Sequence, residues 1–521
     1  MNNNTSEHVT AGQVRRASRN LIGDALRRSV RRNPDKEALR FGTRAWRYAA
    51  LDTAANRVAN RLLGLGLVPG DRVAAYGRNS DAYVLLWLGC VRAGLIHVPV
   101  NYALIDAELA YIVNQSGARA LFCDRDMAGH VVALGATLGC EWQGTLDGGT
   151  GHDVLAWAMA TGFEEAPAVD VDEEDIAQLL YTSGTTAAPK GAMMSHRALM
   201  AEYTSTLLAT DICAEDRSLA SLPLYHSAQM HVFLMPQLLV GASTLLVQAP
   251  QAEQCFELIE NERVTSFFAP PTVWISFLRH PGFDQSDLSS LQKGYYGASI
   301  MPVPVLQELA ARLPALSLYN CYGQSEVAPL ATVLRPAEHA QRPASAGRAV
   351  FNVDMRVVDI NMHDVAPGEM GEIVHRSPQL MSGYWNKPEE TAAAFADGWF
   401  RSGDVGYLDE AGYLYITDRI KDIIKTGGVV VSSREVEECL YLHPAVAEVA
   451  VIGLADPRWI EAVTAVVCLK EGAQVDAEVL IAHAHAHLAP FKVPKRIHFV
   501  EDMPRNASGK LLKRELRVRY S

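Results

Sequence analysis

The chain lacks the features that would place it in a membrane or in an oxidising compartment. No apolar run reaches the length of a membrane-spanning helix, and the first residues lack the apolar core of a signal peptide. The eight cysteines stand apart, with no C-x-x-C pair that would indicate a zinc or redox site. We therefore expect a cytoplasmic protein with reduced thiols and no integral membrane association.

Basic residues are also fewer than acidic residues. Lys and Arg number 47 against 59 Asp and Glu, which gives a formal net charge of −12. Nucleic-acid phosphates bind to basic surfaces, so no nucleic acid is expected as a partner. The exception is a local cluster at helical spacing, which predicts a solvated helix face rather than a contact with anionic lipid: Arg27, Arg28, Arg31 and Arg32.

The composition that remains is globular, and the chain is long enough for more than one core. With 521 residues, of which 49% are hydrophobic and 20% charged, two or more domains are expected. An amphipathic helical stretch at 51–63 alternates with short apolar strands at 72–76, 242–247 and 265–269. Repeated strand–helix units predict an α/β fold with parallel sheets covered by helices.

The pattern changes after about residue 350. Short strands bounded by Gly, Asp and Asn at 354–358, 371–375 and 412–417 predict a small β-rich subdomain. The remaining segment predicts an α+β unit in the order helix 433–442, strand 446–453, strand 461–469, helix 479–488 and a polar tail.

These patterns divide the chain into three parts. We predict a flexible leader, a large N-terminal domain that includes the β-rich subdomain at about 350–420, and a small C-terminal domain. Their predicted bounds are 1–16, 17–420 and 421–521.

The segment from Tyr181 to Gly191, YTSGTTAAPKG, gathers hydroxyls, glycines and one lysine. It follows an apolar run that predicts a buried strand and precedes a helical pattern that begins at His196. Glycines let backbone N–H groups face an anion, hydroxyls add donors and Lys190 adds charge, so the loop predicts a polyphosphate site. A Walker A loop has its lysine directly after the second glycine, so P-loop kinases and motor ATPases are disfavoured.

This loop resembles the signature loop of the adenylate-forming (ANL) superfamily, which includes acyl-CoA synthetases, peptide-synthetase adenylation domains and beetle luciferases. Further segments resemble motifs of the same superfamily and follow in its order: LPLYHS (222–227), YNCYGQSE (319–326), RSGD (401–404) with YLYITDRIKD (413–422), and PRNASGK (504–510). The chain is most similar to bacterial fatty acyl-CoA synthetases. The resemblance implies that the C-terminal domain is a mobile lid hinged at Lys421.

The resemblance also implies the cofactors ATP, Mg²⁺ and coenzyme A, with a role for each motif. Glu326 would hold Mg²⁺, Lys510 would bridge the attacking carboxylate and the α-phosphate, and His226 would lie between the acyl group and the thiol. Contacts to ATP or AMP are implied for Thr182, Ser183, Gly184, Thr185, Thr186, Lys190, Tyr322, Gly323, Ser325, Asp404 and Arg419. An acyl pocket is implied for Tyr225, His226, Tyr295, Tyr296, Gly297 and Ala298, and an approach of CoA for Gly427, Gly428 and Trp459.

These residues suit the activation of an acid. A carboxylic acid reacts poorly with a thiol until its oxygen becomes a good leaving group, and an acyl adenylate provides one. The chemistry needs positioning and cations more than proton transfer. We therefore expect an acyl-CoA ligase that forms acyl-AMP and transfers the acyl group to CoA by domain alternation. Medium or long acyl chains are expected by the resemblance, while aromatic and polycyclic acids, and the oligomeric state, a homodimer included, stay open.

Two departures from the family pattern keep alternatives open. Ala187 stands where members usually carry glycine, and a Cβ there penalises a positive φ. Gly427 and Gly428 are usually followed by Glu-Asn, whereas here the run is Val-Val-Val-Ser. Both changes fit an enzyme with weak or lost adenylation that takes a preformed acyl adenylate.

Three other functions were weighed. An acid-activating enzyme that loads a carrier protein stays open, although no fused carrier domain is visible. A luciferase-like oxygenase has no supporting motif. A non-catalytic binding protein is disfavoured because the chain keeps Glu326, Asp404, Arg419 and Lys510.

The alternating histidines His483, His485 and His487 lie in the predicted helix 479–488. A two-residue spacing spreads side chains around a helix. No metal site is therefore predicted there.

Overall fold

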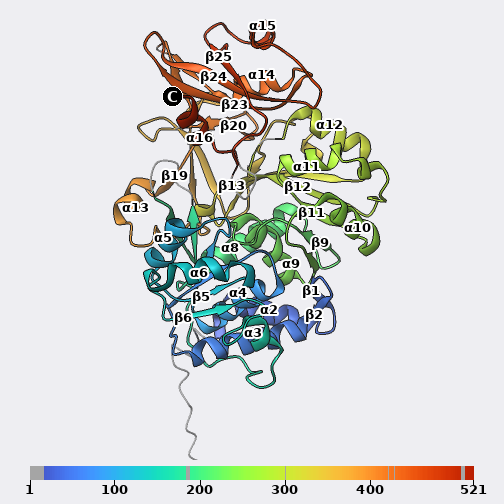
Figure 1. Ribbon diagram of the computed structural model, residues 1–521, viewed down its shortest axis with the longest axis vertical. Coiled ribbons are helices and arrows are strands. Elements are labelled where there is room, and N and C mark those ends of the chain that lie inside the picture. The colour runs from blue at the N-terminus through green and yellow to red at the C-terminus, as the bar shows by residue number, and fades with distance from the viewer. Residues whose placement is uncertain are drawn as a thin grey trace, which may run out of the picture.

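The structure is a computed structural model of the chain, and it describes residues 14, 17–182, 188–299, 301–420, 422–427, 429–505 and 511–521. Figure 1 shows a large lobe and, above it, a smaller lobe made by the C-terminal residues. The expected leader, 1–16, lies outside the described residues except for Val14. Among the helices in the described part of the chain, none combines the length and apolar character needed to cross a membrane.

Two mostly parallel sheets form the large lobe. The first has, in spatial order, β15 (Arg348–Ala349), β14 (Leu330–Leu334), β13 (Ser317–Gly323), β12 (Lys293–Gly297), β11 (Ser266–Phe268), β9 (Arg217–Ala220), β10 (Ser243–Leu246), β1 (Glu37–Phe41) and β2 (Arg44–Arg47). The second has β6 (Trp142–Thr145), β5 (Ala118–Cys123), β3 (Arg72–Tyr76), β4 (Ile96–Val100), β7 (Ile176–Thr182) and β8 (Lys190–Ser195). Only β2, β14, β15 and β8 pair antiparallel, so the predicted α/β class is confirmed.

Helices cover these sheets (Figure 1). They are α2 (Ile22–Arg32), α3 (Tyr48–Gly64), α4 (Asp81–Ala93), α5 (Asp106–Ser116), α6 (Ala128–Leu134), α7 (Val154–Met159), α8 (His196–Thr210), α9 (Met235–Val240), α10 (Ala252–Glu262), α11 (Pro271–Arg279) and α12 (Val303–Arg312). Every residue of α4 is buried, because this helix contacts β1 of one sheet and β3 and β4 of the other. A helix that is apolar on all sides suits such a position.

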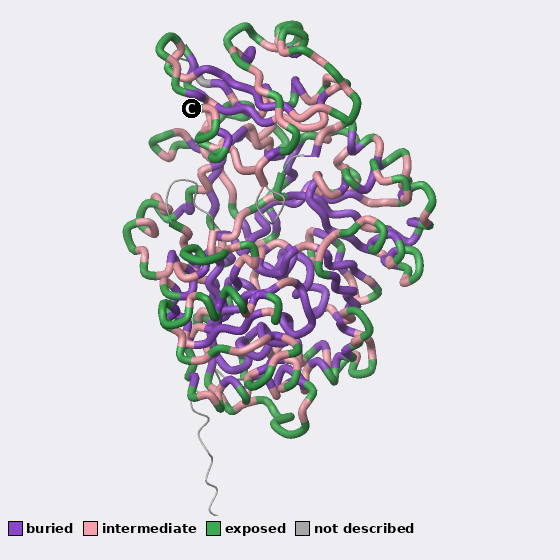
Figure 2. Tube along the Cα trace, viewed as in Figure 1, coloured by how far each residue is buried: buried purple, intermediate pink, exposed green. Residues whose placement is uncertain are grey.

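The caps of α4 follow from its sequence. Ser80 accepts a hydrogen bond from the backbone N–H of Tyr83 at 3.1 Å, which satisfies a donor of the first turn. Gly94 ends the helix at φ 67°, in the left-handed region that glycine adopts without a Cβ penalty. The main core of the large lobe packs around this helix, and buried residues fill the interior of the lobe in Figure 2.

A buried polar chain crosses the same interior. The hydroxyl of Tyr203 on α8 lies 2.8 Å from Nδ1 of His231, whose Nε2 lies 2.7 Å from Oε1 of Gln178 on β7. Nε2 of Gln178 in turn lies 3.0 Å from Nδ1 of His97 on β4. His231 lies in the π-helix η3 (Ala228–Leu234), so the chain ties this segment to the strand that leads into the predicted phosphate loop.

The predicted β-rich subdomain is a five-stranded antiparallel sheet. Its strands are β16 (Asp354–Val358), β17 (Gly371–Arg376), β18 (Phe395–Ala396), β19 (Trp399–Leu408) and β20 (Leu414–Arg419), and the short helix α13 (Pro388–Ala394) precedes β18. Strand β20 ends one residue before Ile420 and the next strand begins in a different sheet at Ile424. The predicted hinge residue Lys421 falls between them and lies outside the described residues.

The C-terminal unit has a sheet of its own with helices packed on it. Its elements are β21 (Ile424–Thr426), β22 (Val429–Val431), α14 (Ser433–Tyr441), β23 (Val446–Asp456), β24 (Ile460–Leu469), α15 (Ala477–His487), β25 (Arg496–Phe499) and α16 (Lys513–Tyr520). The four predicted elements are confirmed, with β23 and β24 longer toward their shared turn. The prediction of a polar tail was wrong, because β25 pairs parallel with β24 and Leu516 of α16 is fully buried.

Candidate functional site

Three predicted nucleotide-binding residues meet beside the small sheet. Tyr322, near the end of β13, donates its hydroxyl to Oδ2 of Asp404 at 2.8 Å, and Nε of Arg419 lies 3.0 Å from Oδ1 of Asp404. Asp404 is only 3% exposed and stands opposite Arg419 in the β19–β20 register. Desolvation, followed by the charge of Asp404, raises the pKa of Tyr322 well above its ordinary value, so the phenol stays a donor. The carboxylate of Asp404 has oxygen lone pairs that can accept hydrogen bonds from further hydroxyl groups.

Glu326 lies four residues after Tyr322 and belongs to a second cluster. Its Oε1 accepts a hydrogen bond from the hydroxyl of Tyr384 at 2.9 Å, and Nζ of Lys190 lies 5.0 Å from the centre of the Tyr384 ring. Burial, followed by the charge of Glu326, raises the pKa of Tyr384 above its ordinary value. Tyr384 thus contacts a carboxylate through its hydroxyl and an ammonium group through its ring.

Backbone pairing explains how Tyr384 comes to this position. Trp385 donates its N–H to the carbonyl of Gly191 at 2.8 Å, and Met193 donates to the carbonyl of Gly383 at 2.9 Å. The segment around Tyr384 therefore runs beside β8, which begins at Lys190. Sequence reasoning missed Tyr384, although the aromatic pair Tyr384-Trp385 after Gly383 was a signal that could have been followed.

The predicted phosphate loop is anchored at both of its ends. Thr182, the last residue of β7, pairs with Lys190, the first residue of β8, in antiparallel register. The predicted loop residues between them, Ser183, Gly184, Thr185 and Thr186, lie outside the described residues, as do Ala187, Gly428 and Lys510. The roles assigned to them stay predictions.

The aromatic and histidine motif lies against the Glu326 segment. Oγ of Ser227 and Oγ of Ser325 are 3.0 Å apart, which joins the two motifs. The rings of Tyr225 and His226 lie 4.4 Å apart between centres, and Tyr102 packs edge-on against Tyr225 at 5.5 Å. His226 directly precedes the turn that opens the π-helix η3, and such π-turns are frequent at functional sites.

Strand β12 carries the other predicted acyl-site residues. The hydroxyl of Tyr295 donates to the carbonyl of Thr210 at 2.9 Å, and that of Tyr296 lies 3.0 Å from Nε2 of His339. The two rings belong to separate core clusters, so they pack the interior on opposite faces of the sheet. Gly297 and Ala298 follow at the strand end, where Ala298 is exposed. The acyl-site role of all four stays a prediction.

Two glycines of the predicted site are fixed by close packing. A Cβ at Gly323 would lie 1.7 Å from the carbonyl oxygen of Pro329, and one at Gly297 would lie 2.2 Å from that of Cys321. Backbone approaches of this kind admit only hydrogen. Both glycines are therefore required by the fold of the site, whatever they also contribute to a ligand.

The residues expected near CoA also meet. Gly427 donates its N–H to the carbonyl of Trp459 at 2.7 Å, and a Cβ at Gly427 would lie 3.3 Å from the indole. Nζ of Lys495 lies 5.3 Å from the centre of the Trp459 ring. The turn between β21 and β22 is thus held against Trp459, with a cation on the indole.

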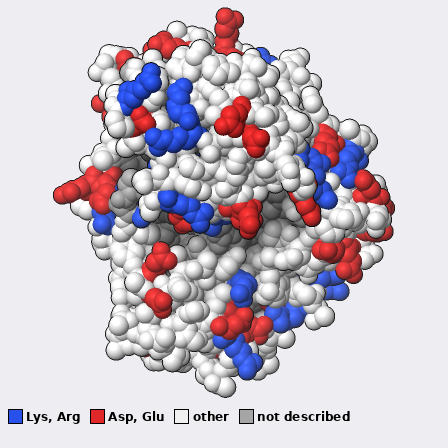
Figure 3. Space-filling model, turned by 45° about the horizontal axis from the view of Figure 1, so that its top comes forward, with Lys and Arg blue, Asp and Glu red and all other residues white. Residues whose placement is uncertain are grey.

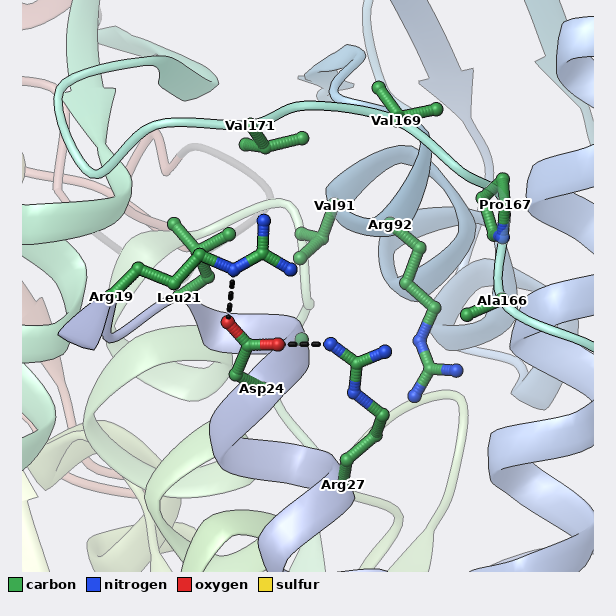
Figure 4. A pocket seen from close by; sticks show the side chains of 11 residues that line it. Arg19, Leu21, Asp24, Arg27, Val91, Arg92, Ala166, Pro167, Val169 and Val171 are labelled. Atoms are coloured by element: carbon green, nitrogen blue, oxygen red, sulfur yellow. Dashed lines mark hydrogen bonds and ion pairs between the residues drawn. The ribbon is translucent and has the colours of Figure 1, made fainter. Parts of the chain in front are cut away.

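Arginine side chains of α2 make contacts within the protein. Asp24 pairs with Arg19 at 3.0 Å and with Arg27, while Arg32 donates to the carbonyl of Leu239 at 3.0 Å. Arg19, Asp24 and Arg27 line a cavity of about 40 Å³ (Figure 4), which is near the ~30 Å³ of one water molecule and too small for an acyl group. On the face seen in Figure 3, a small group of Lys and Arg side chains lies at the upper left, and charges of both signs are spread over the rest.

The histidines of α15 require a correction. His483 and His487 are four residues apart and lie on the same side of the helix, with ring centres 4.5 Å apart. His483 and His487 are therefore not spread around the helix as predicted. Together with Cys439 of α14 they bring three metal-ligating atoms within 4.8 Å of one another.

Two helix-covered sheets, the grouped motif residues and a smaller C-terminal unit are the arrangement expected of an adenylate-forming enzyme. The model of the AMP-binding enzyme family matches residues 26–385, and that of the AMP-binding enzyme C-terminal domain matches residues 435–510. The chain belongs to the AMP-binding enzyme family.

Relatives and solved structures agree over nearly the whole chain. Feruloyl-CoA synthase of an Amycolatopsis species is 38% identical over 95% of this chain and 98% of its own. The long-chain-fatty-acid–CoA ligase FadD13 of Mycobacterium tuberculosis is 34% identical over 91% and 93%. The crystal structure of ATP-bound MatB from Rhodopseudomonas palustris is 31% identical, with a TM-score of 0.89 over 96% of this chain and 99% of that chain.

The activity follows from this membership and these relatives. The protein is an acyl-CoA ligase, which joins a carboxylic acid to ATP as acyl-AMP and transfers the acyl group to coenzyme A. The expectation from the sequence is confirmed for the class of enzyme and for the use of ATP and CoA.

Proposed function

We propose that the nucleotide contacts two clusters of side chains, one at each end of the segment from Tyr322 to Glu326. The single observation that carries this proposal is that Tyr322 reaches Asp404 and Arg419, whereas Glu326, four residues on, reaches Tyr384 beside Lys190. In this proposal Asp404 accepts the ribose hydroxyls while it pairs with Arg419. Lys190 contacts the terminal phosphates as they leave.

We propose Mg²⁺ as a cofactor held by Glu326. The residues fit the ion, because a carboxylate that is 8% exposed and oriented by Tyr384 offers the hard oxygen ligand that Mg²⁺ prefers. When bound, the ion neutralises phosphate charge. Lys510 would bring the attacking carboxylate toward the α-phosphate, and Gly427 with Trp459 would receive the pantetheine arm for the second step.

We further propose that the acid carries an aromatic ring on a short side chain. Support comes from the 38% identity to feruloyl-CoA synthase and the 33% identity to the indoleacetate–CoA ligase of Aromatoleum aromaticum. The buried pair Tyr102 and Tyr225 offers ring faces beside His226. This class differs from the fatty acids expected from the sequence, which stay the second candidate because of the 34% identity to FadD13.

The test measures both half-reactions across a panel of acids. Pyrophosphate release with Mg·ATP is compared for arylpropenoic, arylacetic, medium-chain and long-chain acids, and CoA-thioester formation is followed from the matching synthetic acyl adenylates. The proposal expects the highest kcat/KM for an aryl acid in both assays. A higher kcat/KM for long-chain acids contradicts the substrate class. Thioester formation without pyrophosphate release supports the alternative of weak or lost adenylation.

The acceptor is tested in the same experiment. Fatty acid–acyl-carrier-protein ligase ScoC of Streptomyces coeruleorubidus is 34% identical to this chain. A carrier protein is therefore the second candidate acceptor of the acyl group. Thioester formation is therefore compared between CoA and a phosphopantetheinylated carrier protein. Lys510→Ala serves as the control for adenylation, since it should abolish pyrophosphate release while leaving transfer from the adenylate.

A further inference from the structure

Two helices of the C-terminal unit turn metal-ligating side chains toward each other. Helices α14 and α15 contact one another, and Figure 1 places α15 at the end of the molecule away from the large lobe. Cys439 lies on α14, while His483 and His487, one helical turn apart, lie on α15. The side chains come from positions 44 residues apart in the chain, so the packing of the two helices creates this group.

The group has the size of a metal site. The ligand atoms of Cys439, His483 and His487 all lie within 4.8 Å of one another. Bonds of ~2.0–2.3 Å in a tetrahedral zinc complex put neighbouring ligand atoms about 3.5 Å apart, so an ion would draw them together by about an ångström. Side-chain rotation can supply this movement, because His487 is exposed and His483 is half-buried.

Backbone carbonyls already orient both imidazoles. Nε2 of His483 lies 3.0 Å from the carbonyl oxygen of Cys439, and Nδ1 of His487 lies 2.8 Å from the carbonyl oxygen of His483. A carbonyl oxygen only accepts, so these two nitrogens carry the hydrogen. In the neutral rings, Nδ1 of His483 and Nε2 of His487 therefore keep a lone pair. Metal-bound histidines in proteins are held by the same kind of hydrogen bond from the other nitrogen.

A third histidine, His443, lies near this group but has a different orientation. The ring of His443 meets that of His483 edge-on at 5.3 Å, and its Nδ1 accepts a hydrogen bond from the N–H of Ala445 at 3.3 Å. Its lone pair is thus already used in the neutral ring. The protein supplies three ligands, and the fourth position of a tetrahedral ion is left for water.

We propose that Cys439, His483 and His487 bind a divalent transition-metal ion of the Zn²⁺ class at a site separate from that of Mg·ATP. One thiolate and two imidazoles are a borderline-soft donor set that favours Zn²⁺ over Mg²⁺ or Ca²⁺. On binding, the thiol gives its proton to water as the sulfur–metal bond forms. The ion joins α14 to α15 and stabilises the C-terminal unit by binding the folded state.

The test uses the full chain, purified under reducing conditions without bound metal. Zn²⁺ is titrated in competition with a chromophoric chelator, and Co²⁺ is used as a spectroscopic probe. We expect one ion per chain and a thiolate-to-cobalt charge-transfer band. Cys439→Ser should abolish that band, and His487→Ala should weaken Zn²⁺ binding by at least ~10-fold.

The matched control is His485→Ala, which changes a histidine of the same helix that contributes no ligand atom to the group. It should bind Zn²⁺ like the wild type. His487 is exposed, so His487→Ala should fold and release pyrophosphate normally, which separates a lost metal site from a lost fold. Equal Zn²⁺ affinity in the wild type, Cys439→Ser and His487→Ala overturns the proposal, as does a Co²⁺ complex without the charge-transfer band.

Discussion

At the scale of single residues, Tyr384 contacts both Glu326 and Lys190, for which phosphate-side roles are proposed. Its hydroxyl donates to Glu326 at 2.9 Å and its ring faces Lys190 at 5.0 Å. Tyr384→Phe keeps the ring and removes a hydrogen bond to a carboxylate, which is worth about 1.5 kcal/mol. We expect kcat/KM for Mg·ATP in pyrophosphate release to fall about 10-fold, since 1.4 kcal/mol is a factor of ten.

The control for this variant is Tyr407→Phe. Tyr407 belongs to the small sheet, where its ring stacks on Tyr415 with centres 4.9 Å apart. Its kinetics should equal those of the wild type. An unchanged kcat/KM in Tyr384→Phe would show that Glu326 does not need this donor.

His375 makes stability depend on pH. It is fully buried on β17, and neither ring nitrogen has a hydrogen-bond partner among the described residues. Desolvation lowers the pKa of His375 from 6.5 to about 4. The unfolded chain therefore binds the proton first, so this residue costs stability as the pH falls from about 6.5 toward 4.

The measurement compares His375→Leu with the wild type between pH 7 and pH 5. Because each pKa unit is 1.36 kcal/mol, the wild type should lose about 2 kcal/mol more than the variant over this range. His363→Leu is the control, since His363 is 77% exposed on its side chain and should leave the pH dependence unchanged. Parallel curves for the wild type and His375→Leu would contradict the assignment.

At the scale of elements, Gln178 holds β7 in place. Its amide joins His97 on β4 to His231 in η3, and desolvation first lowers the pKa of both histidines to about 3, so both rings stay neutral. Gln178→Leu leaves two buried ring nitrogens without partners. The expected loss of stability is about 3 kcal/mol, which lowers the apparent melting temperature.

Gln143→Leu is the matched change in the same sheet. Gln143 lies on β6 with an exposed side chain, so its substitution should alter stability by less than about 0.5 kcal/mol. The measurement is thermal unfolding of both variants beside the wild type. Similar melting temperatures for Gln178→Leu and Gln143→Leu would mean that the buried chain contributes little.

Some helices and strands were predicted from the sequence and others were not. Alternation and apolar runs predicted strands such as 72–76, which is β3 at the same bounds. They missed β25 and α16, because their apolar residues are sparse and these elements pack against distant partners such as β24 and β23. Helices and strands that depend on packing against other elements are only weakly indicated by their own sequence.

At the scale of the whole molecule, Gly427 tests the proposed role of the C-terminal unit in the second half-reaction. Gly427 has φ 57° and lies against Trp459. In Gly427→Ala the strained backbone costs about 1 kcal/mol and the new methyl presses on the indole. We expect thioester formation from a synthetic acyl adenylate to fall on the order of 10-fold, while pyrophosphate release changes little.

Gly472→Ala isolates the contribution of backbone strain. Gly472 has φ 75° and nothing within 4 Å of a Cβ position, so it shares the strain without the contact. Both half-reactions should be near the wild type in this variant. A fall in pyrophosphate release as large as that in thioester formation for Gly427→Ala would argue against a role confined to CoA transfer.

The sequence by itself determined the family, the α/β class and the identity of the motif residues, because these depend on local patterns and on side-chain chemistry. Only the tertiary structure decided which of them meet. Tyr384 reaches Glu326 from 58 positions away, and His483 with His487 meets Cys439 across two helices. Tyr295 and Tyr296, which are adjacent in sequence, pack in two separate core clusters. Contacts between distant segments arise from packing, so the local sequence of one segment does not specify which other segment packs against it.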